Sequence, residues 1–313
     1  MSDSSFAPTG DALSESNPAA RGAELQQGTS LWQDAWKRLR RNRMAVASIY
    51  VLAAMFVASF TLPYVIPLVA GPRYRPEVQA LEYGCQPPSA LHWFGTDFLG
   101  RDLLVRTVHG ARMSLMVGLL AAAVAAGVGT LYGAFSGYLG GRTDALLMRV
   151  VDVLYSLPYM FIVILLVTFF GKKLLLIFVA LGLVGWLTTA RIVRGQVMSL
   201  KEREFVLAAR SIGQSHSQIV LRHLIPNTLG PIIVYFTLTV PSMILQEAFL
   251  SFLGLGVQEP APSLGSLISE GAGQIAVFWW PLIFPAGVLC LLLLALSFLG
   301  DGLRDALDPH MKS

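Results

Sequence analysis

The sequence has few charged residues and almost no cysteine. Only 13% of its 313 residues are Asp, Glu, Lys or Arg, roughly half the share of a typical soluble domain. Hydrophobic residues make up 54%, and the mean hydropathy is +0.61. This composition excludes a disordered chain, a fibrous protein and an ordinary cytosolic enzyme. The two cysteines, Cys85 and Cys290, lie far apart in different contexts, so we expect neither a disulfide nor a zinc site.

The sequence also lacks a phosphate-binding loop and a catalytic constellation. The pattern GxxxxGK[ST] does not occur, and Gly171-Lys172-Lys173 has neither the glycine spacing nor the hydroxyl residue. His216 and His223 could share a helical face, but no carboxylate or thiol joins them. We therefore expect no catalytic residue, no metal, no cofactor in this chain and no binding of nucleic acid.

Six long apolar runs dominate what is present. Each is close to the roughly 20 residues that a helix needs to cross about 30 Å of hydrocarbon, and none carries a charge near its middle. A backbone in lipid must satisfy its own hydrogen bonds, and the alternating pattern of a barrel strand is absent. We therefore predict an all-α polytopic membrane protein in the lipid bilayer. The predicted spans are residues 44–66, 113–137, 153–170, 174–190, 232–253 and 279–299.

The basic residues predict the orientation of these spans. If all six runs cross the membrane, sixteen of the 23 Lys and Arg residues lie on the side of the N-terminus. The positive-inside rule then places both termini in the cytoplasm. Residues 67–112 become a periplasmic loop, 191–228 a cytoplasmic loop and 300–313 a cytoplasmic tail. Residues 1–29, rich in Ser, Ala, Gly and Glu, are predicted to be a disordered tail.

Residues 30–43 are predicted to form an amphipathic helix before the first span. Ser30 can cap its N-terminus, and Trp32, Trp36 and Leu39 form one apolar stripe surrounded by basic residues. This pattern is typical of a helix that lies on the inner leaflet. The alternative is a simple stop-transfer cluster of charges.

Two sets of residues indicate how the second and fourth spans are placed. Gly129, Gly133 and Gly137 follow each other at four-residue spacing, which lets helices approach closely within the molecule. Arg191 and Arg194 stand at the inner end of the fourth span, where we expect them to anchor the helix in the headgroups.

The loop after the fourth span is patterned too regularly to be flexible. Phe205, Ala209 and Ile212 fall at i, i+4 and i+7, which is one helical face. Gly213 can end that helix, and Ser215 can cap the next. We predict two short helices that project from the membrane with an apolar ridge. The ridge could fit a groove in a soluble partner or lie on lipid.

This loop resembles the EAA loop of the permease subunits of ATP-binding cassette (ABC) importers, EAA, three residues, Gly, nine residues, I-x-L-P. The chain matches the spacing at Ala209, Gly213 and Pro226 and departs from the motif at Leu207, His223 and Ile225. In that family the loop holds a coupling helix that docks on an ATPase subunit. The resemblance and the helical pattern give these candidate coupling residues: Glu204, Phe205, Ala208, Ala209, Gly213, Ser215 and Pro226.

Further stretches narrow the resemblance. FGTDFLGRDLLVR at 94–106 and GDGLRDALDP at 300–309 are similar to hallmarks of the C-type permease subunits of peptide importers. Additional matching runs are ARMSLMVG (111–118), GTLYG (129–133), RIVRGQ (191–196), VPSMIL (240–245) and SFLGLGVQEP (251–260). The resemblance covers residues 29–313 and is closer to oligopeptide than to dipeptide permeases.

The resemblance implies a type I ABC importer permease fold with six spans in the bacterial inner membrane. It implies that the chain forms half of a pathway taking short peptides from periplasm to cytoplasm. The implied partners are a second, B-type permease, a periplasmic oligopeptide-binding protein and two ATPase subunits that bind ATP and Mg. Because this chain has no phosphate loop, it would receive energy only through the projecting helices.

Three alternatives remain beside this hypothesis. A dipeptide permease would have the same architecture. An ion-coupled secondary transporter usually buries carboxylates or histidines at mid-membrane and shows interrupted helices in repeated halves, and the sequence shows neither. A membrane-embedded enzyme would need a His or carboxylate cluster at an inner face, which is missing.

Polar side chains also occur inside the fifth span and in the outer loop. Gln246 and Glu247 lie inside the fifth span, where Glu247 could line the peptide path or meet a peptide amino terminus. The alternative, which we prefer, places Glu247 at the outer headgroups. In the outer loop, Asp97, Arg101 and Asp102 could suggest paired catalytic carboxylates, but the interposed arginine favours a local salt bridge that caps a surface helix.

Overall fold

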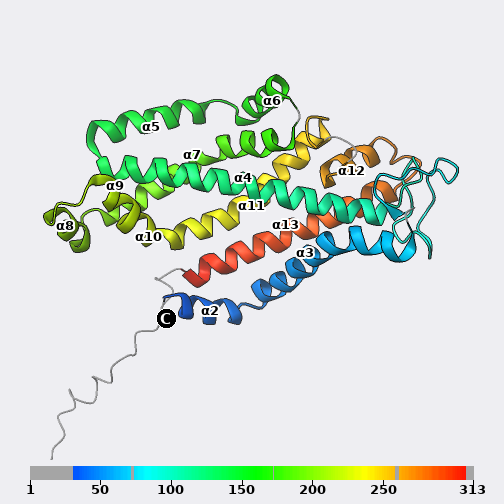
Figure 1. The fold of residues 1–313 in the computed structure, drawn as a ribbon, viewed down its shortest axis with the longest axis horizontal. Coiled ribbons are helices and arrows are strands. Elements are labelled where there is room, and N and C mark those ends of the chain that lie inside the picture. The colour runs from blue at the N-terminus through cyan, green and yellow to red at the C-terminus, as the bar shows by residue number, and fades with distance from the viewer. Residues whose placement is uncertain (1–30, 72–73, 172, 258–260, 308–313) are drawn as a thin grey trace, which may run out of the picture.

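A computed structural model describes residues 31–71, 74–171, 173–257 and 261–307. Within these ranges the chain is helical and contains no strand, apart from one isolated bridge between Thr96 and Asp102. Long helices run side by side along the molecule (Figure 1). Residues 74–102 gather at one end, here called the loop end, and the short helices α8 to α10 lie at the other. Cys85 and Cys290 are both free, as predicted.

Among the described residues, five helices are long and apolar enough to cross a membrane, or six if one bent pair is counted as a span. The single helices are α3 (Arg43–Ala70), α4 (Leu103–Leu139), α7 (Leu174–Leu200), α11 (Leu229–Phe252) and α13 (Trp280–Leu307). The bent pair is α5 (Gly141–Ser156) and α6 (Tyr159–Phe170). The shorter elements are α2 (Leu31–Arg41), α8 (Glu204–Ser211), α9 (His216–Ile219), the π-helical turn η2 (Val220–Leu224), α10 (Ile225–Asn227) and α12 (Leu264–Ala272).

Several helices differ in extent from the predicted spans. α4 begins at Leu103 rather than at residue 113, because the Asp102 side chain caps it by accepting a 2.9 Å hydrogen bond from the backbone N–H of Val105. α7 continues beyond residue 190 to Leu200, and α13 continues into the predicted tail. The predicted third span is two helices that meet at 83°. Pro158 stands at that break, where a proline disfavours a helical conformation of the residue before it.

α4 and α7 pack against each other through glycine. A Cβ on Gly129 would lie 2.7 Å from the carbonyl oxygen of Trp186, and one on Gly133 would overlap the carbonyl of Ala190. Gly137 stands equally close to the backbone of α7. The predicted close packing of this glycine face within the molecule is therefore confirmed.

The arginines at the end of α7 pair with carboxylates of α5. Arg194 donates two hydrogen bonds to Asp144, at 2.6 and 2.5 Å. Arg191 donates to Asp152 at 2.8 Å, and its guanidinium lies 4.3 Å from the Tyr155 ring centroid. The structure thus gives both arginines counter-charges on α5, and their predicted anchoring in the headgroups stays a prediction.

The helix before the first span packs partly on protein. Leu39 of α2 is buried with Ala45 of α3 and Ala306 of α13. Trp36, in contrast, is half exposed beneath the guanidinium of Arg40. The predicted apolar stripe is therefore split between a protein contact and an exposed face. The predicted tail at 1–29, the Ser30 cap, the Trp32 side chain and the end of the 300–313 tail lie outside the described residues.

The α4–α7 contact gives a matched test. Gly133→Ala should force the two backbones apart, and overpacking of this kind costs about 1–3 kcal/mol. Gly127→Ala on the same helix meets nothing within 4 Å and should leave stability unchanged or slightly raised, since alanine favours helix. Thermal unfolding of the two purified variants in detergent measures the difference, and equal melting temperatures would contradict the role of this contact.

Candidate functional site

Residues 201–228, between α7 and α11, form a compact body that we call the projection (Figure 1). It has an apolar core of its own, shared with the ends of two long helices. From the projection this core contains Val206, Ala209, Ile219, Val220 and Leu224, and beneath them lie Ala134 and Tyr138 of α4 and Val193 and Val197 of α7. The projection is therefore packed onto α4 and α7 and does not hang from a flexible loop.

α8 presents different residues to the protein and to the outside. Val206 and Ala209 are buried, whereas Phe205 is 38% exposed and Ile212 is 75% exposed. The predicted ridge of Phe205, Ala209 and Ile212 is therefore wrong for Ala209, which faces inward. The sequence also offers Val206 and Ala209 at i, i+3 spacing, and this stripe, overlooked in the prediction, is the one that packs.

The turn between α8 and α9 follows the predicted chemistry. Gly213 has φ +78°, a left-handed conformation that ends α8, and the Gln214 N–H donates back to the Ala209 carbonyl at 3.2 Å. Ser215 caps α9 in a reciprocal capping box with Gln218. The predicted helix stop and cap are both confirmed, and they fix the angle between the two short helices.

Polar contacts hold the projection on α4. The Tyr138 hydroxyl is 3.1 Å from Nδ1 of His216, and the Arg210 guanidinium lies 5.1 Å from the Tyr138 ring centroid. Nε2 of His223 is 2.7 Å from the Gln214 side-chain oxygen. Both histidines thus have structural partners, and no cluster that could hold a metal occurs in the part of the chain that the structure describes.

All candidate coupling residues lie on the projection, but they do not share one surface. Those with exposed positions are Glu204, Phe205, Ala208, Gly213, Ser215 and Pro226, whereas Ala209 is buried. Phe205 and Ala208 of α8 and Ile212, the residue directly after α8, fall at i, i+3 and i+7 and form an outward apolar face. We call these three residues the outer face of α8.

At the loop end, a buried ion network joins α4 to α12. Arg101 donates to Asp97 at 2.6 Å, and Arg106 pairs with Asp97 and, at 2.9 Å, with Glu270. The predicted Asp97–Arg101 salt bridge is confirmed, but it is buried and not on a surface helix. Arg106 and Glu270 were missed, because they lie far apart in sequence and no local pattern links them.

Burial and the nearby Asp97 charge raise the pKa of the Cys85 thiol to about 11.

Glu247 is fully buried between three helices. Its carboxylate accepts hydrogen bonds from Ser114 of α4 at 2.9 Å and from Ser251 at 2.6 Å, and Ser263 at the start of α12 donates to Ser251. These hydroxyl groups surround the Glu247 carboxyl group in place of water, and its preferred placement at the depth of the outer headgroups stays a prediction. A role of Glu247 and of the half-buried Gln246 on a transport path stays a prediction.

Comparison with known families decides where this fold belongs. Residues 129–313 match the family model described as "Binding-protein-dependent transport system inner membrane component", and residues 30–88 match "N-terminal TM domain of oligopeptide transport permease C". The chain belongs to the binding-protein-dependent inner membrane permeases. This confirms the resemblance, and it makes the chain a transport subunit of an ABC importer and a multi-pass inner membrane protein.

Individual relatives of this permease agree. The chain is 52% identical over 292 residues to the oligopeptide transport system permease protein OppC of Haemophilus influenzae, covering 93% of both chains. It is 55% identical over 283 residues to OppC of Escherichia coli K12, covering 90% of this chain and 92% of the relative. It is 47% identical over 284 residues to the dipeptide permease DppC of Bacillus subtilis, covering 90% and 87%.

A solved structure shows the same fold. A chain of the inward-facing MetNI methionine ABC transporter superposes with a TM-score of 0.52 at 20% identity, covering 65% of this permease and 96% of that chain. The predicted fold class, a type I ABC importer permease, is thereby confirmed.

The ion network yields a prediction on stability. Arg106→Gln should destabilise this permease by about 3 kcal/mol, because it removes one of the two arginines that neutralise the buried Asp97 carboxylate. Glu270→Gln should lower the free energy of unfolding less in the Arg106→Gln background than in the wild-type chain, since the two residues are in direct contact. Thermal unfolding of the two single variants and the double variant measures this coupling. Strictly additive losses would show that the pair does not act as a unit.

Proposed function

We propose that this permease is the C-type subunit of an ATP-driven importer of short peptides. It forms half of the pathway, and a homologous B-type permease forms the other half. The names of its relatives support peptides as the substrate, and identity to oligopeptide permeases, 52% and 55%, exceeds the 47% to a dipeptide permease. We infer that oligopeptides are delivered by a periplasmic binding protein, as the family description suggests.

The observation that carries the coupling mechanism is the two-sided packing of α8. Its inner side is fixed on α4 and α7 through Val206 and Ala209, while its outer face is open and apolar. We infer that the outer face docks in a groove of an ATPase subunit, and that two such subunits bind ATP and Mg for the assembly. Closure of the ATPase pair would then move the projection together with the ends of α4 and α7.

We also infer the orientation of the chain in the membrane. The excess of Lys and Arg on the side of the projection supports a cytoplasmic projection and cytoplasmic termini, with the loop end in the periplasm.

Reporter tags test this orientation. Tags after Leu200 and His310 should report cytoplasm, and a tag at Cys85 should report periplasm. An alkaline phosphatase fusion active at Leu200 would reverse the assignment and remove the projection from the reach of an ATPase.

Charge on the outer face of α8 should uncouple transport. Phe205→Asp and Ile212→Asp should each weaken ATPase binding at least about tenfold, because a carboxylate would enter an apolar contact. Phe205→Leu and Ile212→Val are the matched controls that keep the face apolar. Peptide uptake into membrane vesicles and co-purification of the ATPase subunits are the measurements.

Folding and docking effects can be separated in the same series. Val206→Asp places a charge in the core beneath α8 and should reduce the amount of folded permease, whereas the outer-face variants should melt like the wild type. Normal uptake by Phe205→Asp and Ile212→Asp would remove the outer face from the coupling mechanism. Uptake driven by an ion gradient without any ATPase would favour a secondary transporter instead.

A further inference from the structure

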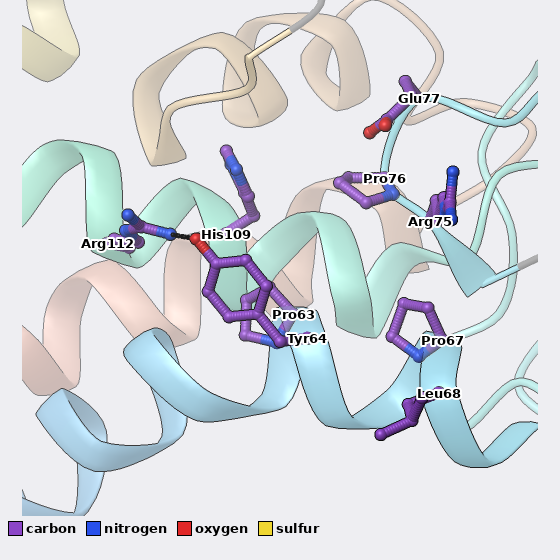
Figure 2. A pocket seen from close by; sticks show the side chains of 9 residues that line it. All are labelled: Pro63, Tyr64, Pro67, Leu68, Arg75, Pro76, Glu77, His109 and Arg112. Atoms are coloured by element: carbon purple, nitrogen blue, oxygen red, sulfur yellow. Dashed lines mark hydrogen bonds between the residues drawn. The ribbon is translucent and has the colours of Figure 1, made fainter. Parts of the chain in front are cut away.

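A hollow of about 440 Å³ opens at the loop end between α3 and α4 (Figure 2). The C-terminal part of α3 forms one wall, with Tyr64 and Leu68, and residues 75–77 form the rim. His109 and Arg112 of α4 form the opposite side. Nothing in the coupling mechanism uses this hollow, which lies at the opposite end of the molecule from the projection.

Arg112, at the side of this hollow, has only neutral partners among the described contacts. Arg112 donates one hydrogen bond to the Tyr64 hydroxyl at 2.7 Å, and its guanidinium lies 4.9 Å from the Phe60 ring centroid, so both neighbours are neutral. Its Nε and the Nδ1 of His109 are buried, and neither has a hydrogen-bond partner among the described residues. The positive charge of Arg112 is therefore not balanced by a carboxylate among the contacts that the structure describes, and a buried or half-buried charge normally has a counter-charge.

The charges around the hollow favour an anion. Arg75 supplies a second guanidinium, and Glu77 is the only carboxylate among the described residues of the lining. The lining therefore has an excess of positive charge even with His109 neutral. Arginine recognises phosphate particularly well, since its planar fork can donate two parallel hydrogen bonds.

The surroundings of the hollow favour a ligand with apolar chains. Only 17% of the apolar window of α3 is buried inside the protein, the smallest share among the five single spans. Phe56 and Val57 on this helix are exposed, as are Tyr64 and Leu68 at the hollow itself. Arg112 directly precedes the apolar run that starts at residue 113. This position corresponds to the depth at which lipid headgroups meet hydrocarbon.

We propose that this hollow binds a phospholipid whose phosphate contacts the guanidinium of Arg112, with Arg75 as a second contact. The acyl chains lie against the exposed apolar surface of α3 around Phe56 and Val57. Because guanidinium groups outnumber carboxylates in the lining, the site prefers anionic phosphatidylglycerol over zwitterionic phosphatidylethanolamine. The lipid fills the hollow between α3 and α4 and supplies a negative charge beside Arg112.

Native mass spectrometry of the full chain in detergent tests the proposal by titration with phosphatidylglycerol. Arg112→Gln should weaken binding of the first lipid roughly tenfold, the loss expected for a hydrogen bond between charged groups. Arg75→Gln should weaken it less, since Arg75 is exposed. Arg149→Gln is the matched control: it removes the same charge from an exposed position on α5 and should leave the affinity unchanged.

Two results of this titration would overturn the proposal. One is an Arg112→Gln chain that melts like the wild type and binds phosphatidylglycerol equally well. The other is an equal loss in Arg149→Gln, which would show that only total charge matters. If Arg112→Gln does not fold, the wild-type chain is photo-crosslinked in membranes that contain photoactivatable phosphatidylglycerol. Labelling of the peptides that contain residues 60–70 and 103–115 would support lipid in the hollow. Labelling elsewhere, or disulfide capture of another subunit by Leu68→Cys, shows that lipid does not fill the hollow.

Discussion

The close approach of α4 and α7 is the contact on which the other features of this permease depend. Gly133 and its neighbours one turn away lack side chains of their own, which lets the backbone of α4 approach α7 closely. In a membrane, where lipid is as apolar as leucine, this kind of packing supplies much of the attraction between helices. The pair carries the ion network at one end through Arg106 and the base of the projection at the other through Tyr138 and Val197.

Buried polar groups connect the elements that this packing does not reach. α12 is too short to span a membrane, and it is held by Glu270 on Arg106 and by Ser263, which joins the hydroxyl cluster around Glu247. A charge inside a bundle is expensive unless it is paired, so these contacts leave α12 few alternative positions. The loop end is thereby tied to the same α4 that supports the projection.

The sequence predicts what local chemistry determines and misses what distant partners determine. Gly213 and Ser215 could be assigned because a helix stop and a cap depend on adjacent residues. The start of α4 could not, because Arg106 makes its first turns look polar, and the carboxylates that neutralise it are Asp97 in the preceding loop and Glu270 in another helix. Hydropathy likewise identified an apolar third span, but the length of the run could not show that Pro158 divides it into two helices at 83°.

The orientation of α8 on the protein could not be predicted from its sequence pattern, and the reason is physical. Periodicity shows which residues share a face of a helix, but it does not show which face meets the protein. Only the position of Tyr138 and Val197 decides that Val206 turns inward and Phe205 outward. This choice also determines how force would travel. A load on Phe205 cannot move α8 without moving the core beneath it, and that core belongs equally to α4 and α7. Because the backbones of these two helices are in direct contact, they would respond as one body, and the displacement would reach Arg106 and α12 at the far end.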